Sequence, residues 1–260
     1  MARFKRRLGV NIDHIATLRQ ARLSAYPDPA DSLPILKACH VDQVTLHLRE
    51  DRRHIQDADL ASLIKTSKIP VNLEMAVTGE MLAIALRSAP DTVTLVPERR
   101  QEVTTEGGLD CLHKTKDLAI GVGRLRAAGI RVSLFIDPEP SQIKAAVAIN
   151  ADAVEFHTGS YCESIEAVYR QHGHYHWQKD KKMSPAILRE WERLAKASKM
   201  AKEVGLAVFA GHGLHVHNLK PVTQIREIEE YNIGHAIIAR AVFIGLKTAI
   251  QEIQVILNRP

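Results

Sequence analysis

Ionisable side chains stand at the C-terminal ends of several short apolar runs in this sequence. The carboxylates, imidazoles and amides at these ends include Asn11, Asp13, His14, His47, Asn72, Glu74, Glu155, His157, His212 and His235. Carboxyl groups held among apolar walls have raised pKa values, so they can exchange protons with neighbouring imidazoles near neutral pH. The repetition of this arrangement favours one shared site for general acid–base catalysis.

Arginines lie close to the same positions. Arg19, Arg22 and Arg49 follow the first two runs, and a guanidinium group binds phosphate well because it donates two parallel hydrogen bonds. No lysine lies at the end of a run, so a Schiff base on an enzyme amine is not expected. If imine chemistry occurs here, the amine should belong to a substrate.

A metal site is the main alternative for the group formed by Asp13, His14 and His47. No His-X-His pair occurs at the end of a run, so we expect no metal and no other cofactor. A second histidine group, at residues 172, 174 and 176, has no acidic residue or cysteine close beside it. We expect no metal there either.

These residues need a scaffold that brings many strand ends together. Eight strands are expected, at about Arg7–Asp13, Asp42–Leu48, Pro70–Met75, Thr92–Val96, Arg131–Ile136, Ala153–Thr158, Leu206–Ala210 and Tyr231–Gly234. Segments with helical spacing separate most of them, which implies parallel strands with right-handed crossovers. The sequence predicts an α/β fold, a single-domain (β/α)8 TIM barrel over residues 1–260.

Two connecting regions are longer than a minimal barrel needs. Residues 97–116, which contain Thr104, follow the fourth strand, and residues 159–184 follow the sixth. Loops of this length inside a compact domain are usually lids or binding loops. We therefore expect additional helices and long loops after strands four and six.

The eighth unit decides where a phosphate group can bind. Residues 235–239 could continue the strand, but apolar residues from Ile237 to Leu257 recur at helical spacing. We therefore end the strand at Gly234 and begin a helix near His235. A glycine that enters a helix leaves backbone amides open to a phosphate, and barrels often hold phosphate after strands seven and eight.

The composition is that of a globular protein. The chain has 260 residues, 45% of them hydrophobic and 5% aromatic, which suits a barrel interior filled by Val, Ile and Leu. No apolar run reaches the length of a membrane span, and no signal-peptide pattern opens the chain. The three cysteines are far apart, so we expect no disulfide framework and a location in the reducing cytoplasm.

The formal net charge of +5 comes partly from basic clusters at residues 3–7 and 179–182. Neither cluster has the interleaved aromatic residues of a single-strand binding surface, and neither lies beside a helix-turn-helix pattern. A nucleic-acid-binding protein is the non-enzymatic alternative, but it would leave the polar strand ends unexplained. We expect small-molecule substrates, no nucleic acid and no membrane.

Several segments resemble the pyridoxine 5′-phosphate synthase family. They are Leu8–Arg19, His47–His54, Asn72–Ala76, Val96–Gly108, Ala210–Leu214 and Asn232–Ala236, in the family's order from about Leu8 to Leu246. The region Ser160–Glu190 departs from the family, since it is longer and richer in His and Lys. The resemblance implies a barrel that condenses 1-deoxy-D-xylulose 5-phosphate with 3-amino-2-oxopropyl phosphate to give pyridoxine 5′-phosphate, phosphate and water.

The resemblance also implies roles for individual residues. His47 and Glu74 would accept protons, His212 would donate one, and Glu155 would stabilise cationic or protonated intermediates. The implied ligands of the aminoketone phosphate are Asn11, Gly213, Gly234 and His235, with Arg22 reaching that side. Those of the deoxyxylulose phosphate are Asp13, His14, Arg49, His54 and Thr104. Family members are octamers, so a homo-oligomer is implied.

Three of these assignments have structural alternatives. Asp13 could cap the following helix, Glu155 could simply pair with His157, and His54 could be an ordinary surface residue. Another phosphate-binding barrel, such as a sugar-phosphate isomerase or lyase, is the competing enzyme. It would act on a single sugar phosphate and need no amine.

Overall fold

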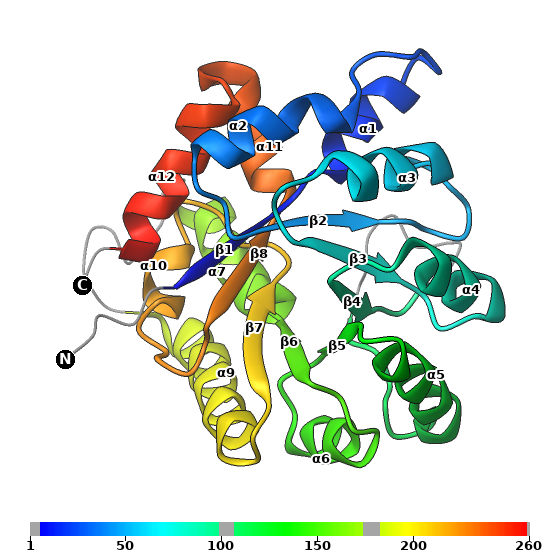
Figure 1. Ribbon diagram of the computed structural model, residues 1–260. Coiled ribbons are helices and arrows are strands. Elements are labelled where there is room, and N and C mark those ends of the chain that lie inside the picture. The colour runs from blue at the N-terminus through cyan, green and yellow to red at the C-terminus, as the bar shows by residue number, and fades with distance from the viewer. Residues whose placement is uncertain (1–5, 99–106, 174–182, 259–260) are drawn as a thin grey trace.

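Eight parallel strands close into a barrel that helices surround (Figure 1). The computed structural model describes residues 6–98, 107–173 and 183–258. The strands are β1 (Arg7–Asn11), β2 (Gln43–His47), β3 (Val71–Met75), β4 (Thr92–Leu95), β5 (Arg131–Ile136), β6 (Ala153–His157), β7 (Ala207–Gly211) and β8 (Glu230–Ile233). Each strand pairs in parallel with the next, and β8 pairs with β1, so the sheet has no free edge.

The helices follow the strands in sequence. They are α1 (Asp13–Gln20), the 3-10 helix η1 (Pro29–Ser32), α2 (Leu33–Ala38), α3 (Asp57–Thr66), α4 (Gly79–Ser88), α5 (Thr115–Ala127), α6 (Pro140–Ala148), α7 (Gly159–His172), α9 (Pro185–Glu203), α10 (Leu219–Val222), α11 (His235–Ile244) and α12 (Leu246–Asn258). More than one helix follows β1, β6 and β8. The prediction of a TIM barrel with additional helices is confirmed.

The predicted strands agree with the structure to within two residues at every end. The predicted change from strand to helix in the eighth unit is also confirmed, because β8 ends before Gly234 and α11 begins at His235. The apolar pattern that runs on to Leu257 does not form one helix. At Gly245 the backbone has φ +79°, a conformation that favours glycine, and the chain turns there before α12 begins.

The long region predicted after the sixth strand is partly helical. Its first half is α7, which ends at His172, and the chain leaves the helix at Gly173, where φ is +70°. Residues 174–182, with two of the three alternate histidines, lie outside the described residues. The same holds for residues 99–106, and therefore for Thr104.

Polar side chains, rather than Val, Ile and Leu, fill much of the barrel interior. Asn232 of β8 donates a hydrogen bond to Glu155 of β6 at 2.7 Å, and Gln43 of β2 donates one to Glu230 of β8 at 2.9 Å. These pairs join strands that are not neighbours, so they meet inside the barrel. The prediction of an aliphatic interior is therefore wrong.

The apolar strand residues lie on the opposite face. Val44 and Leu46 of β2, and Val93 and Leu95 of β4, belong to the same buried core as Leu63 of α3 and other helix residues. Because side chains alternate along a strand, this core between sheet and helices leaves the other face of most strands to polar residues.

In the described part of the chain, no helix combines the length and apolar character needed to cross a membrane.

Candidate active site

The carboxyl ends of β1, β2 and β3 bring four of the predicted residues together. Asp13 Oδ1 accepts a hydrogen bond from the His47 backbone amide at 2.8 Å, and Asp13 Oδ2 accepts one from Asn11 Nδ2 at 2.9 Å. Asn11 Nδ2 also lies 3.5 Å from Glu74 Oε2. Asp13, His47 and Glu74 each offer one atom within 4.8 Å of the others, so we call these three residues the acid–base cluster.

Asp13 does not cap the helix that follows it. It is the first residue of α1, and the preceding Ile12 makes no side-chain capping bond. Its carboxylate instead bonds to Asn11 and to the backbone of His47. The capping alternative is therefore wrong, and Asp13 orders the strand ends around the cluster.

Glu74 has the electrostatic environment of a proton acceptor. Burial raises the pKa of its carboxyl well above the usual range, and the nearby carboxylates of Glu155 and Asp13 raise it further. A general base works best when its pKa is near the working pH, because it is then often unprotonated and still binds a proton strongly. Glu74 is therefore well placed to take a proton from a bound molecule.

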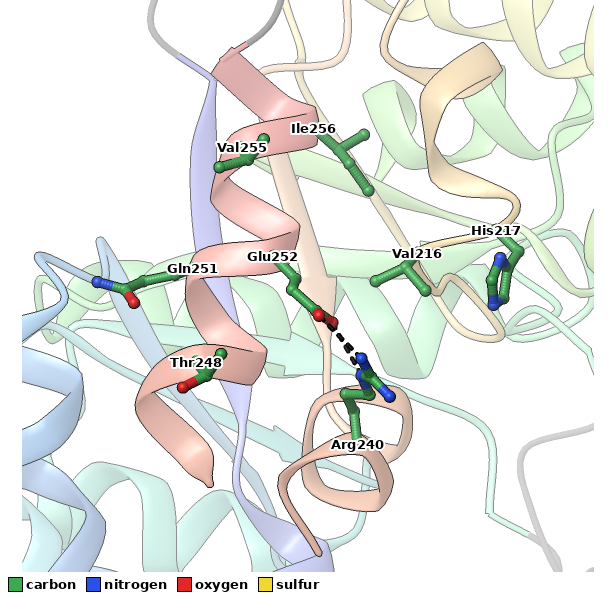
Figure 2. Close-up of a pocket in the computed structure, with 8 residues that line it drawn as sticks. All are labelled: Val216, His217, Arg240, Thr248, Gln251, Glu252, Val255 and Ile256. Carbon is green, nitrogen blue, oxygen red and sulfur yellow. Dashed lines mark hydrogen bonds and ion pairs between the residues drawn. The ribbon is translucent and has the colours of Figure 1, made fainter. Parts of the chain in front are cut away.

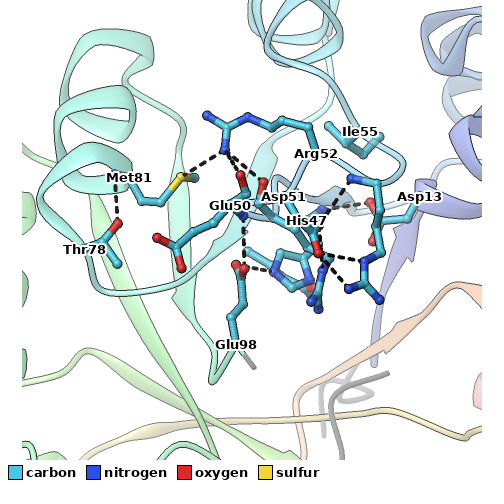
Figure 3. A network of polar contacts seen from close by, with 12 residues as sticks. Asp13, His47, Glu50, Asp51, Arg52, Ile55, Thr78, Met81 and Glu98 are labelled. Carbon is cyan, nitrogen blue, oxygen red and sulfur yellow. Dashed lines mark hydrogen bonds and ion pairs between the residues drawn. The ribbon is translucent and has the colours of Figure 1, made fainter. Parts of the chain in front are cut away.

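His47 has a partner that the sequence interpretation missed. Glu98, three residues after β4, places Oε1 3.0 Å from His47 Nε2, and its Oε2 accepts a hydrogen bond from the Glu50 amide at 3.0 Å (Figure 3). Burial by itself would raise the pKa of Glu98. The hydrogen bonds from His47 and from the Glu50 amide, together with the charges of His47 and Arg49, outweigh burial, so the pKa of Glu98 is lowered. Glu98 thus orients the imidazole and ties it to the loop after β2.

The loop between β2 and α3 carries Arg49 and His54. Arg49 is buried, and the half-buried His54 ring has its centroid 6.1 Å from that of His47, so His54 is not an ordinary surface residue. Arg52, drawn in Figure 3, donates to the Arg49 carbonyl at 2.9 Å and pairs with Glu80 of α4 at 2.8 Å. These bonds anchor the loop beside the cluster.

Arg19 holds the same loop rather than a phosphate. Its guanidinium forms two bonds of 2.6 Å to the Asp59 carboxylate, and both side chains are buried. The Nη2 atom also donates to the His54 carbonyl at 3.2 Å. The N–H groups of Arg19 therefore already bond to α3 and to the loop. The structure does not support Arg19 as a phosphate-binding residue.

Glu155 lies inside the barrel on β6, with 2% of its surface exposed. Asn232 Nδ2 donates to its Oε2 at 2.7 Å, and a Cβ atom on Gly211 would stand 2.0 Å from its Oε1, so only glycine leaves it room. Burial raises the pKa of Glu155 to about 8, Glu230 adds to the rise, and Asn232 opposes it.

Glu155 and His157 do not form the simple pair that the sequence allowed. Glu155 bonds to Asn232, whereas His157 Nδ1 lies 3.1 Å from Asp137 Oδ1 at the end of β5. That alternative is therefore wrong, and Asp137 is a second carboxylate that the sequence interpretation missed.

His212 and Gly213 form a turn after β7, with φ of +76° and +79°. Such a conformation is uncommon for a residue with a Cβ atom and persists only where neighbours enforce it. Thr158 Oγ1 donates to the carbonyls of Gly211 and His212, and Asn218 Nδ2 donates to the Gly213 carbonyl at 2.9 Å. The imidazole of His212 is thereby held at the strand end.

Burial lowers the pKa of His212 to about 4, and the neighbouring His157 contributes to the decrease. The imidazole is therefore neutral at pH 7. A neutral imidazole must take up a proton before it can act as a strong proton donor, so any donation by His212 follows an earlier uptake.

The junction of β8 and α11 meets the end of β1. A Cβ atom on Gly234 would lie 2.8 Å from Asn11 Cβ, so the glycine lets the two strand ends approach closely. The His235 ring, at the start of α11, contacts the His14 ring edge-on, with centroids 5.0 Å apart. The structure thus brings these four predicted residues together.

Arg22 stands apart from these contacts. It is exposed in the turn that follows α1, whereas most of the other described candidates lie on or just after the strand ends. Gly213 is exposed as well, at the rim formed by the turn after β7.

A separate groove of about 590 Å³ lies between α12 and the loop after β7 (Figure 2). Val216, His217 and Ile256 line it, together with Arg240 and Glu252, which pair at 2.9 Å. None of its lining residues belongs to the acid–base cluster. The barrel mouth, rather than this groove, carries the candidate chemistry.

The acid–base cluster contains the one group of potential metal ligands found within the described residues. Asp13 and Glu74 offer carboxylate oxygens and His47 an imidazole nitrogen, so these three could hold a cation. Their atoms already have protein partners, however. Asp13 accepts two hydrogen bonds, and His47 Nε2 bonds to Glu98. This arrangement suits proton transfer without a metal.

A metal chelator is therefore expected to leave activity unchanged. The measurement is turnover after dialysis against a chelator, compared with a sample dialysed against buffer alone. A large loss that zinc or manganese restores would instead assign Asp13, His47 and Glu74 to a metal.

The fold and the site together define a TIM-barrel protein with an acid–base cluster at the carboxyl ends of its strands. A family model described as pyridoxal phosphate biosynthesis protein PdxJ matches residues 8–259, so the chain belongs to that family.

Curated relatives match nearly the whole chain. A pyridoxine 5′-phosphate synthase of Sulfurihydrogenibium sp. (strain YO3AOP1) is 51% identical over 256 residues, which cover 97% of this chain and 98% of the relative. One of Geobacter sulfurreducens is 49% identical over 246 residues, covering 95% and 96%.

Solved structures with little sequence identity share the fold. A 3-keto-L-gulonate-6-phosphate decarboxylase of Vibrio cholerae has a TM-score of 0.60 and 11% identity, with 98% of each chain covered. An N-(5′-phosphoribosyl)anthranilate isomerase of Pyrococcus furiosus has a TM-score of 0.59 and 14% identity, covering 97% of this chain and 98% of its own. At this identity the likeness concerns the barrel alone.

Proposed function

We propose that this protein is a pyridoxine 5′-phosphate synthase, as its curated relatives are named. It would condense 1-deoxy-D-xylulose 5-phosphate with 3-amino-2-oxopropyl phosphate to form pyridoxine 5′-phosphate, inorganic phosphate and water. The observation that carries the proposal is the acid–base cluster, in which Asp13, His47 and Glu74 meet within 4.8 Å at the barrel mouth. Ring closure between two carbonyl compounds requires several proton transfers, and this cluster can perform them.

The proton acceptors in this reaction are His47 and Glu74. Glu98 holds the His47 imidazole, and the pKa of Glu74 is raised toward the working range of a general base. His212 is the proposed donor, after it has taken up a proton, and the buried carboxyl of Glu155 stabilises cationic or protonated intermediates. The attacking amine belongs to the aminoketone phosphate, because no enzyme lysine stands at a strand end.

The two phosphorylated substrates occupy different sectors of the mouth. We place the aminoketone phosphate against Asn11, Gly213, Gly234 and His235, with Arg22 approaching from the turn after α1. We place the deoxyxylulose phosphate against Asp13, His14, Arg49, His54 and Thr104. The start of α11 supports the first placement, since this ten-residue helix begins at His235 and the first backbone amides of a helix can donate to a phosphate.

Requirement for both substrates tests this function against a sugar-phosphate isomerase or lyase. The measurement is the release of inorganic phosphate from the deoxyxylulose phosphate, with and without the aminoketone phosphate. A synthase releases phosphate only when both compounds are present. Conversion of the deoxyxylulose phosphate alone would favour the isomerase or lyase.

Gly234→Val is expected to weaken binding of the aminoketone phosphate at least tenfold, or about 1.4 kcal/mol. The added side chain would occupy the space that Asn11 now fills and would displace that amide. The deoxyxylulose phosphate should be affected less. Calorimetry of each substrate with folded variant protein measures both affinities. Gly79→Val, at the start of α4, is the matched control, because nothing lies within 4 Å of a Cβ atom there.

Equal losses for the two substrates would indicate general damage to the barrel. Unchanged affinity for both would place the aminoketone phosphate elsewhere.

We also propose that the protein is a homo-oligomer, an octamer by family resemblance. Large apolar residues are exposed on α1, on the turn after it and on α11, which packs against α1: Leu18, Leu23, Tyr26, Val242 and Phe243. Exposed apolar residues gathered on neighbouring elements often mark a surface that binds another protein. A cytoplasmic location is proposed as well, since all three cysteines are buried free thiols.

Phe243→Glu is expected to reduce the mass of the oligomer measured by light scattering, because a charge replaces a side chain that is 83% exposed in the single chain. Val204→Glu, at an exposed site at the end of α9, is the control. A wild-type protein with the mass of one chain would contradict self-association, and an unchanged mass in Phe243→Glu would contradict this interface.

A further inference from the structure

A second imidazole lies against His212. The ring centroids of His157 and His212 are 4.9 Å apart, with the planes tilted by 55°. Phe135 contacts both rings, with centroid distances of 5.3 Å to His157 and 6.4 Å to His212. His157 is buried at the end of β6 and has no role in the function proposed above.

Asp137 holds His157 in this position. Its Oδ1 atom lies 3.1 Å from His157 Nδ1 and also accepts a hydrogen bond from the Gly108 amide at 3.2 Å. The His157 imidazole lowers the pKa of the Asp137 carboxyl below its usual range. A Cβ atom on Gly159 would stand 2.5 Å from His157 Nε2, so glycine at that position leaves space for the ring.

We propose that His157 is a positioning residue of the reaction: it is held by Asp137 and acts through the His212 imidazole against which it packs. The proposal rests on the proposed function, in which His212 moves a proton. His157 itself need not touch either substrate.

The physical basis is the repulsion between two neighbouring imidazoles. Both cannot carry a positive charge at low cost, so the first to gain a proton keeps the second neutral. Asp137 holds His157 through Nδ1 and thereby keeps its ring against that of His212. His212 lacks a carboxylate partner among its described contacts, so burial and the neighbouring His157 keep it neutral and ready to accept a proton.

Other charged groups surround the pair in the described part of the chain. Arg193 of α9 acts on Asp137 and favours its ionised form. Glu155 lies two positions before His157 on β6 and bonds to Asn232 instead. The effect assigned to His157 must therefore be measured against variants of Asp137, not inferred from pH dependence alone.

The test is NMR titration of the His212 ring in protein without substrates. In His157→Asn the midpoint of the His212 titration is expected to rise by at least about half a pH unit, because the imidazole that helps to lower the His212 pKa is removed. Asp137→Asn should move the midpoint in the same direction. Asp137 is 40% exposed, so this variant keeps the proposal testable if His157→Asn fails to fold.

The two substitutions should not be additive. Asp137→Asn in the His157→Asn background should leave the His212 midpoint where the single substitution put it, since Asp137 acts only through His157. His113→Asn removes the surface imidazole that pairs with Asp110 and is 84% exposed. It is the matched control and should not move the midpoint.

Turnover supplies the second readout. Both His157→Asn and Asp137→Asn should lower kcat at least about tenfold, with KM nearly unchanged, and should shift the pH profile of kcat. An unmoved His212 midpoint in both variants overturns the proposal. A wild-type protein that makes no product, with the midpoint moving as expected, refutes the synthase function and leaves the electrostatic pairing standing.

Discussion

Glu74→Gln is expected to lower kcat at least about 100-fold while the protein folds normally. The substitution keeps the size of the side chain and its ability to accept a hydrogen bond from Asn11, but it removes the proton acceptor. Burial, together with the neighbouring Glu155 and Asp13, raises the pKa of the Glu74 carboxyl well above its usual range. Steady-state turnover with saturating concentrations of both substrates measures the effect.

Glu203→Gln, at the exposed end of α9, is the control for loss of a carboxylate and should retain full turnover. Circular dichroism and thermal unfolding establish that the Glu74 variant is folded. Full turnover in folded Glu74→Gln would remove this residue from the mechanism.

Glu155→Gln is expected to change the pH dependence of stability. The Glu155 carboxyl has a pKa of about 8 in the fold, against 4.5 for an ordinary glutamate. Between these values the unfolded chain has released a proton that the folded chain keeps. The free energy of unfolding therefore falls as pH rises, by about 1.4 kcal/mol per pH unit from this one group.

This contribution is fully present below the unfolded pKa and is lost as pH rises through the folded pKa. Glutamine cannot ionise, so Glu155→Gln should lose less stability than wild type between about pH 5 and pH 8. Denaturant unfolding at several pH values gives the two curves. Parallel curves for wild type and variant would show that Glu155 is already ionised in the folded protein.

The barrel was predictable because strands and helices each leave a pattern within a short stretch of sequence. Short β-branched runs alternate with segments of helical spacing, and each run occupies its own stretch of chain. The junction at Gly234 was predictable for the same reason, since the change from strand to helix coincides with a glycine. The break at Gly245 was not, because a glycine inside an apolar helical pattern is compatible with either continuation or a turn.

The polar interior could not be predicted from alternation alone. Period-two alternation separates Thr45 and His47 from Val44 and Leu46, but it does not say which face points into the barrel. In a closed parallel sheet both faces are buried, so the usual distinction between a polar outer face and an apolar inner face fails. Hydrogen bonds such as Asn232 to Glu155 decide the question, and they depend on strands far apart in sequence.

The candidate site was predicted better than its supporting partners. Asp13, His47 and Glu74 stand at strand ends, where the fold itself brings them together. Glu98 and Asp137 lie just beyond such ends, and their importance comes from the imidazoles that they contact on other strands. Applying the search for strand-end carboxylates to the residues just after every strand would have found both.

Formation of pyridoxine 5′-phosphate tests the proposed function most directly. Purified protein is mixed with 1-deoxy-D-xylulose 5-phosphate and 3-amino-2-oxopropyl phosphate, without added metal or nucleotide, and the products are identified by mass spectrometry. The arrangement at the barrel mouth predicts pyridoxine 5′-phosphate in proportion to the inorganic phosphate released, and at least about 100-fold slower formation in Glu74→Gln. Absence of this product from folded wild-type protein with both substrates present would contradict it.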